Sequence, residues 1–149
     1  VSKALAYLKT RGSPKLEVVI DSNGGSVAAG LDIYDMLRLY TGETTGIVIS
    51  KAASMATMIL QACNHRLCAQ HAEILIHHVS TKSVSLDTLT SKRKREKLVT
   101  EMKKDQERLY TILRSRTSKA RRDIVRACKL DRFMSPEEAL AFGLIDKII

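Results

Sequence analysis

At 149 residues the chain is long enough to form one domain around one hydrophobic core. Hydrophobic residues make up 44% and charged residues 28% of it, which is ordinary globular usage and excludes wholesale disorder or a fibrous repeat. Three cysteines cannot form an even-numbered disulfide framework, and no apolar run approaches the roughly 20 residues of a membrane span. We expect a single domain over residues 1–149, in a reducing compartment and without a membrane partner.

The net charge of +9 is concentrated in one segment. Residues 91–129 contain fifteen Lys or Arg and five Asp or Glu, a net charge of +10. A nucleic-acid-binding protein needs such a patch, but Tyr110 is the only aromatic residue in this segment, so bases would find no stacking platform. We expect a solvated helix face and no nucleic-acid partner, with nucleic-acid binding as an alternative that a steep salt dependence would support.

The N-terminal half of the sequence alternates short apolar runs with helical patterns. The predicted strands are residues 16–20, 47–49, 66–69 and 73–77, and the predicted helices between them begin at residues 26 and 55. A turn containing Gly24 and Gly25 follows the first strand, and Ser26 is available to cap the first of these helices. This order is typical of a parallel sheet with right-handed crossovers.

The C-terminal half is predicted to be helical. An apolar stripe predicts one long amphipathic helix over residues 86–114, and a helix of that length should project from the domain. A shorter helix is predicted over residues 118–128. Ser135 and Pro136 begin a third helix, which Gly143 ends. The chain also opens inside a predicted helix.

Ser54 lies where the second predicted strand turns into a helix. Small residues, Ala52 and Ala56, stand two positions before and after it, as a sharp elbow requires if the serine hydroxyl is to be exposed. The helix that begins at Met55 directs unpaired N–H groups and its positive dipole end to the same place, which suits an oxyanion. On local sequence alone, a serine at a helix start is more typical of a cap.

Two further features should reach the same edge of the parallel sheet. The glycines at residues 24–25 allow close approach of a substrate, and a free N–H there could complete an oxyanion hole with that of Met55. His77 ends a predicted strand and could be the base that the Ser54 hydroxyl needs. Because side chains alternate along a strand, we expect His78 on the opposite face. A tight turn and a strand-end histidine are the plainer interpretations.

Asp131 lies in a short irregular stretch between two predicted helices. A buried carboxylate there could hold His77 in the correct tautomer and stabilise its charged form. By sequence alone, Asp87 and Asp123 are comparable candidates.

One group of residues has the ligand types of a zinc site. The group is Cys63, His65, Cys68 and His71. It lacks the C-x-x-C knuckle and spans a helix end and a strand, so we expect no metal and no other cofactor. Zinc analysis of the purified protein tests the alternative.

Several separate stretches resemble the Clp protease family, the ClpP-type proteolytic subunits, over nearly the whole chain. The matching stretches are residues 21–27, 29–30, 33–35, 52–55, 74–77, 131–139 and 142–146, with Cys68. Ser54, His77 and Asp131 follow one another in the family's order, which differs from the orders in chymotrypsin, subtilisin and the α/β-hydrolases.

The resemblance implies an α/β fold of the ClpP/crotonase type, a repeated β-β-α superhelix with a parallel sheet and a protruding handle helix. It implies that Ser54 is the nucleophile, His77 the general base and Asp131 the residue that orients it. The backbone N–H groups of Gly25 and Met55 would form the oxyanion hole.

The implied function is a serine endopeptidase that degrades unfolded polypeptides inside homo-oligomeric rings, fed by an AAA+ unfoldase that uses ATP. The family's N-terminal pore-lining segment is expected to be absent from these residues. The implied location is the cytoplasm, or an organelle matrix if a transit peptide was removed.

The sequence departs from the family pattern in two places. Ser50 and Lys51 replace the usual Gly-Gln, and Ala56 replaces the glycine after the methionine. The elbow therefore need not have the exact shape found in the family. Residues 78–82 contain no glycine, whereas the family has a glycine-rich strand there, so peptide binding and ring packing are expected to differ.

Two other classes of function remain open. A Ser-Lys dyad peptidase of the same fold, such as a signal peptide peptidase or a phage head-maturation protease, could use Lys82 as its base. A crotonase-like acyl-CoA enzyme or an inactive subunit would use Ser54 only as a cap.

Overall fold

The computed structural model describes residues 1–81 and 83–149, and its strands form one parallel sheet. The strands are β1 Leu16–Ser22, β2 Thr44–Ala53, β3 His65–Cys68, β4 Glu73–Leu75 and β5 Lys147–Ile148. Their order is β1-β2-β3-β5, with β4 paired to β2, and all of these pairs are parallel. The predicted α/β class with a parallel sheet is therefore confirmed.

Strand β2 pairs with two strands in succession along one edge. Residues 45–48 pair with β3, and residues 51–53 pair with β4. The apolar run at residues 47–49 is thus only the middle of a longer strand, because its polar flanking residues also join the ladder. The second half of β2 and the whole of β4 end side by side, with Ala53 opposite Leu75.

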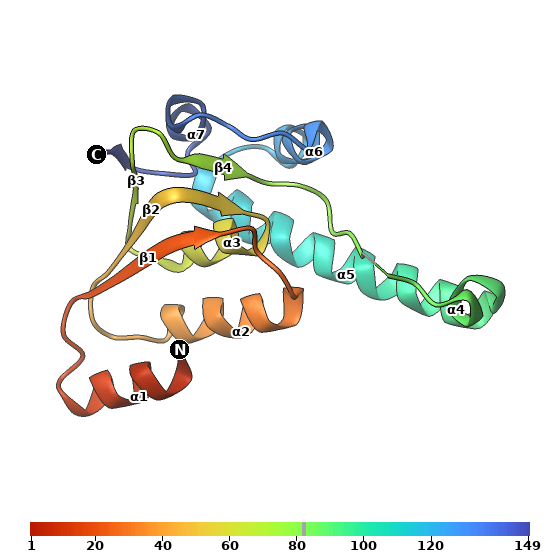
Figure 1. Ribbon diagram of the computed structural model, residues 1–149, viewed down its shortest axis with the longest axis horizontal. Helices are drawn as coiled ribbons and strands as arrows, with labels where there is room; N and C mark the ends of the chain where they lie inside the picture. The colour runs from red at the N-terminus through yellow and green to blue at the C-terminus, as the bar shows by residue number, and fades with distance from the viewer. Residues whose placement is uncertain (82) are drawn as a thin grey trace.

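Three helices of the N-terminal half lie on one side of the sheet (Figure 1). They are α1 Ser2–Thr10, α2 Val27–Arg38 and α3 Met55–Ala62. As predicted, Ser26 caps α2, since its hydroxyl accepts a hydrogen bond from the N–H of Ala29 at 3.4 Å. Helix α3 is buried along nearly its whole length and packs between α2 and the sheet.

The C-terminal half contains α4 Leu86–Thr90, α5 Lys92–Thr117, α6 Arg121–Leu130 and α7 Pro136–Phe142. The prediction of one helix over residues 86–114 was wrong. Ser91 adopts an extended conformation (φ −82°, ψ 112°) and caps α5 by accepting a hydrogen bond from Lys94 N–H. The predicted helix at residues 118–128 begins and ends later, because Ser118 is left-handed (φ 56°) and ends α5.

Helix α5 extends far from the sheet and carries α4 near its outer end (Figure 1). Leu109 and Leu113 in its second half are buried in the main core, whereas Leu98 and Met102 in its first half are only half-buried. The predicted apolar stripe therefore belongs to the core only where α5 lies against the domain. The basic residues of its first turns, 92–95, are exposed to solvent.

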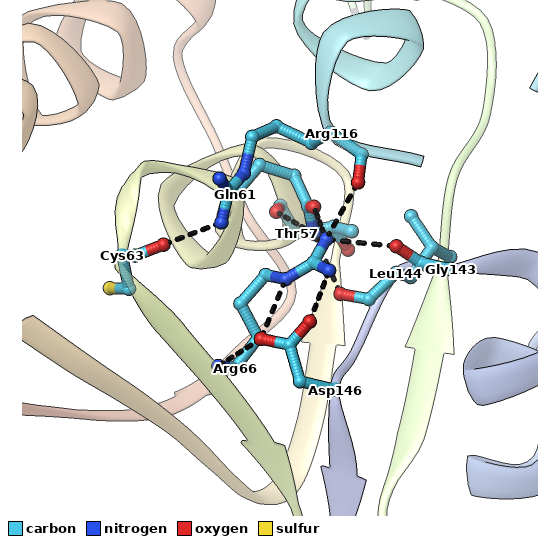
Figure 2. Close-up of polar contacts among 8 residues, drawn as sticks. All are labelled: Thr57, Gln61, Cys63, Arg66, Arg116, Gly143, Leu144 and Asp146. Atoms are coloured by element: carbon cyan, nitrogen blue, oxygen red, sulfur yellow. Dashed lines mark hydrogen bonds and ion pairs between the residues drawn. The ribbon is translucent and has the colours of Figure 1, made fainter. Parts of the chain in front are cut away.

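Arg66, a buried cation, joins the C-terminal end of the chain to α3 (Figure 2). Its side chain donates two hydrogen bonds to the Asp146 carboxylate and one, of 2.6 Å, to Gln61 Oε1 of α3. It donates a further bond of 2.8 Å to the carbonyl oxygen of Gly143, and Gln61 Nε2 donates to Leu144 O at 3.0 Å. Because a buried cation is tolerated only when it is paired, this network fixes α7 and β5 against α3.

Burial alone would raise the pKa of Asp146. The hydrogen bonds and charge of Arg66, together with the charge of Arg116, outweigh that effect and hold the pKa of this carboxyl below its ordinary value. Arg116 donates to the carbonyl oxygen of Cys63 at 2.7 Å. Its own pKa is lowered, first by burial and then by the neighbouring cations Arg66 and Arg38.

No helix within residues 1–81 and 83–149 combines the length and the apolar character that crossing a membrane requires.

Candidate active site

Ser54 forms a strained turn between β2 and α3. Its backbone has φ 57° and ψ −122°, a combination that costs a non-glycine residue on the order of 1–3 kcal/mol. Although Ser54 occupies the N-cap position, its side chain makes no capping hydrogen bond. The structure therefore does not support the interpretation of Ser54 as an ordinary cap. Ser54 lines a cavity of about 400 Å³.

The elbow is held by strand β4. The N–H of Ser54 donates a 2.9 Å hydrogen bond to Leu75 O. The hydroxyl of Thr57, which is fully buried, lies 2.7 Å from Ala52 O and 2.9 Å from Leu75 O. Thr57 thus ties the end of β2, the end of β4 and the first turn of α3 together. Sequence reasoning missed it, and a β-branched hydroxyl in the first helical turn after the serine is its only local signal.

Gly24 lies in the loop after β1 and packs against this elbow. A Cβ atom at Gly24 would lie 2.5 Å from Ala53 O and 2.8 Å from both Met55 N and Ser54 Cβ. Its φ of 86° is also in the left-handed region. Only glycine fits at position 24, because a Cβ there would meet the elbow, and the close approach of a substrate to residues 24–25 stays a prediction. Gly25 lines the cavity beside Ser54.

His77 lines the same cavity as Ser54. The prediction that it ends a strand was wrong, since β4 stops at Leu75, where β2 turns away into the elbow and no longer offers a partner. The prediction for His78 rested on the alternation of strand side chains, and β4 does not extend to residues 77–78. Side chains alternate strictly only within a ladder, and beyond it both His77 and His78 line the cavity.

Asp131 lies behind His77, with its Oδ1 atom 3.6 Å from His77 Nδ1. It ends α6 in a left-handed conformation (φ 48°). The expectation of a buried carboxylate was wrong, because the Asp131 side chain is 68% exposed, whereas that of His77 is 23% exposed. The imidazole therefore has the Asp131 carboxylate at its Nδ1 and contributes to the Ser54 cavity from a half-buried position.

Cys128 is another nucleophile type on this cavity. Burial raises the pKa of its thiol to about 11, so at neutral pH it is a neutral thiol and a poor nucleophile. Ser54, with its free hydroxyl and neighbouring imidazole, is the better placed group for attack on a bound carbonyl.

The geometry can be set beside known proteins. The model of the family described as Clp protease matches residues 1–149, the whole chain. The chain belongs to the Clp protease family. It is also similar to an ATP-dependent Clp protease proteolytic subunit from Leuconostoc citreum (strain KM20), with 33% identity over 148 residues. That alignment covers 97% of this chain and 72% of the relative. The molecule is accordingly a ClpP-type peptidase, a hydrolase.

The departures from the Clp protease pattern leave the elbow in place. Ser50 and Lys51 continue β2, and Ala56 is buried within α3. The strained turn at Ser54 forms with alanine at position 56 as the second residue of the helix. After His77, the described residues from 78 to 81 are in no strand, and Lys82, the proposed alternative base, lies outside the described residues.

The residues considered for zinc are separated by the fold. Cys63 and Cys68 belong to two different buried clusters, and burial raises the pKa of each thiol to about 11. His65 Nε2 lies 2.8 Å from Glu43 Oε1 on the surface. Within the part of the chain that the structure describes, no three His, Cys, Asp or Glu side chains gather as a metal site.

Proposed function

We propose that this Clp protease family member is a serine endopeptidase whose nucleophile is Ser54. The observation that carries the proposal is that Ser54, with a strained backbone and an uncapped hydroxyl, shares a cavity with His77, behind which stands the Asp131 carboxylate. A strained elbow that leaves a serine hydroxyl free, next to an imidazole oriented by an acid, is the arrangement that activates an otherwise inert alcohol.

In the proposed mechanism, Ser54 Oγ attacks the carbonyl carbon of the scissile peptide and passes its proton to His77. The imidazolium formed in this step is stabilised by Asp131, which also selects the tautomer with a hydrogen on Nδ1. His77 then protonates the leaving amine, and an acyl-enzyme remains on Ser54. Water hydrolyses that ester with His77 again as the base.

The N–H groups of Gly25 and Met55 are the proposed oxyanion donors. Within residues 1–81 and 83–149, neither N–H donates a hydrogen bond to a protein acceptor. Met55 is also the first residue of α3, so the positive end of the helix dipole adds to its N–H. Two free donors beside a serine at a helix start would stabilise the negative charge of a tetrahedral intermediate.

Membership of the Clp protease family supports the wider proposal. The subunit would assemble into homo-oligomeric rings, receive unfolded polypeptide from an AAA+ ATPase and use no cofactor of its own. It would act in the cytoplasm or in an organelle matrix. We further propose that residues 1–149 form one peptidase domain.

Labelling with a fluorophosphonate tests the assignment of Ser54. The wild-type protein should be labelled at Ser54, and Ser54→Ala should not be labelled. Ser80→Ala is the matched control, because Ser80 lines the same cavity, and it should react as the wild type does. Equal labelling of the wild type and Ser54→Ala would remove Ser54 from the mechanism.

His77→Ala separates the two kinds of serine peptidase. A Ser-His-Asp enzyme should lose nearly all labelling. Its remaining peptide hydrolysis should be only on the order of 10³ to 10⁴ over the reaction in water. A Ser-Lys dyad enzyme would tolerate the change. A folded oligomer that never reacts with the probe, or one that turns over thioesters, would favour an inactive or crotonase-like subunit instead.

A further inference from the structure

The hydroxyl of Thr57 contacts the ends of two strands beside the candidate nucleophile. Its Oγ1 atom lies 2.7 Å from the carbonyl oxygen of Ala52 in β2 and 2.9 Å from that of Leu75, the last residue of β4. Both of these oxygens can only accept, so the hydroxyl is the donor and its single proton is shared between them. One side chain of α3 therefore links the two strand ends that meet at the elbow.

The carbonyl oxygen of Leu75 connects this hydroxyl to both halves of the candidate site. It also accepts the 2.9 Å hydrogen bond from the backbone N–H of Ser54. His77 follows Leu75 by only two residues and lies in no strand itself. The segment that carries the imidazole is therefore attached to the nucleophile elbow through one carbonyl group, which Ser54 and Thr57 share.

The backbone of Thr57 helps to leave the Ser54 hydroxyl uncapped. The side chain of an N-cap serine ordinarily accepts a hydrogen bond from the N–H of the second or third helical residue. Thr57 is the third residue of α3, and its N–H donates instead to the backbone carbonyl oxygen of Ser54 at 3.1 Å. One of the two N–H groups that an N-cap hydroxyl uses is thus already engaged.

Solvent cannot replace the Thr57 hydroxyl at this place. Thr57 and Ala52 are both 0% exposed, so a carbonyl that loses its donor there finds no water in exchange. The two strand ends would then be free to separate or to shift along each other. A shift of about 1 Å between reacting groups can lower a catalytic rate by 10²-fold, so even a small change in this link should reach the chemistry.

We propose that Thr57 is a positioning residue, whose buried hydroxyl sets the place of the His77 segment relative to the Ser54 elbow. This inference rests on the proposed peptidase function of Ser54. Thr57 is not among the residues that line the Ser54 cavity, so it acts through the carbonyl oxygens of Ala52 and Leu75 and not on the substrate. Without its hydroxyl, the elbow keeps the Ser54 N–H bond to Leu75 but loses the second link.

The test changes the hydroxyl and the volume of Thr57 separately, in the whole chain. Thr57→Val keeps the branched shape but removes the hydroxyl. It should lower the rate constant of fluorophosphonate labelling, and kcat for a fluorogenic peptide, by roughly 10-fold or more, with KM nearly unchanged. Thr57→Ser keeps the hydroxyl but loses a buried methyl group. It should label nearly as fast as the wild type, although its unfolding midpoint in urea should fall.

Thr44→Val is the matched control. Thr44 is also a buried threonine, at the opposite end of β2, and its hydroxyl donates a 2.8 Å hydrogen bond to Asn64 Oδ1. Removing this hydroxyl should lower the unfolding midpoint as well, but it should leave the labelling rate unchanged. Urea unfolding of each variant shows that the rates compare folded proteins.

The outcomes separate the two proposals. A wild-type labelling rate in Thr57→Val, or the same loss of rate in Thr44→Val, would overturn the positioning role. So would an equal loss in Thr57→Ser, because the volume of the side chain and not its hydroxyl would then decide the rate. In all three cases, labelling that disappears in Ser54→Ala would leave the peptidase proposal standing. A folded wild type that is not labelled would remove the peptidase proposal and the role of Thr57 with it.

Discussion

Ile74 and Met134 exchange both of their backbone hydrogen bonds, in an isolated antiparallel bridge between β4 and the segment before α7. Ile74 N donates to Met134 O at 3.1 Å, and Met134 N donates to Ile74 O at 2.7 Å. His77 lies three residues after Ile74 and Asp131 three residues before Met134, so the bridge ties together the two segments that carry the candidate acid-base pair, whose Nδ1 and Oδ1 atoms lie 3.6 Å apart.

Met134→Pro should lower the rate of fluorophosphonate labelling by at least about 10-fold, although no triad residue is changed. Proline removes the N–H that donates to Ile74, so the segment carrying Asp131 loses its attachment to β4. Met134→Leu keeps both the N–H and the buried side chain, and it should react nearly as the wild type does. Equal rates for the two variants would show that the bridge does not position Asp131.

Asp131→Asn should reduce kcat for peptide hydrolysis by roughly 10- to 100-fold. The expected loss is smaller than the ~10⁴-fold loss typical of a buried triad acid, because the Asp131 carboxylate is 68% exposed and water screens its charge. Asp123→Asn is the control, since Asp123 was an equally good candidate by sequence but lies in the first turn of α6. A greater loss in Asp123→Asn would contradict the assignment.

Gly24→Ala should abolish labelling of Ser54 and lower the free energy of unfolding. The new Cβ would lie 2.5 Å from Ala53 O, and alanine is strained at φ 86°. Gly12→Ala is a matched control, because Gly12 has φ 81° but no heavy atom within 4 Å of such a Cβ. Both variants should show the backbone strain of about 1–2 kcal/mol in chemical denaturation, but only Gly24→Ala should lose activity.

Asp146→Asn should make the free energy of unfolding depend less steeply on pH in the acid range. The pKa of Asp146 is lowered in the folded state, so its contribution to stability is present above its unfolded pKa of about 3.9 and is lost as pH falls through the lower, folded value. The wild type should therefore lose stability below about pH 4 with a steeper slope than Asp146→Asn. Urea denaturation between pH 2 and pH 7 measures this, and identical slopes would show that Arg66 does not hold the carboxylate.

The sequence by itself determined the features that depend on neighbouring residues. The capping box in which Ser135 and Glu138 bond each other's backbone N–H groups, the left-handed stop at Gly143 and the cap at Ser26 were all readable from local patterns. The parallel sheet followed from the alternation of strands and helices. The elbow at Ser54 was also visible, because small residues and a helix start surround the serine.

Only the tertiary structure decided which side chains meet. Local sequence could not separate Asp131 from Asp87 or Asp123, because the Ile74–Met134 bridge joins segments about 60 residues apart. Nor could the strand pattern show that β4 ends at Leu75, since that end is set by the turn of its partner β2. Both His77 and His78 line the cavity, in a segment that no longer pairs with β2. Each of these features depends on contacts between distant segments, which local propensity does not encode.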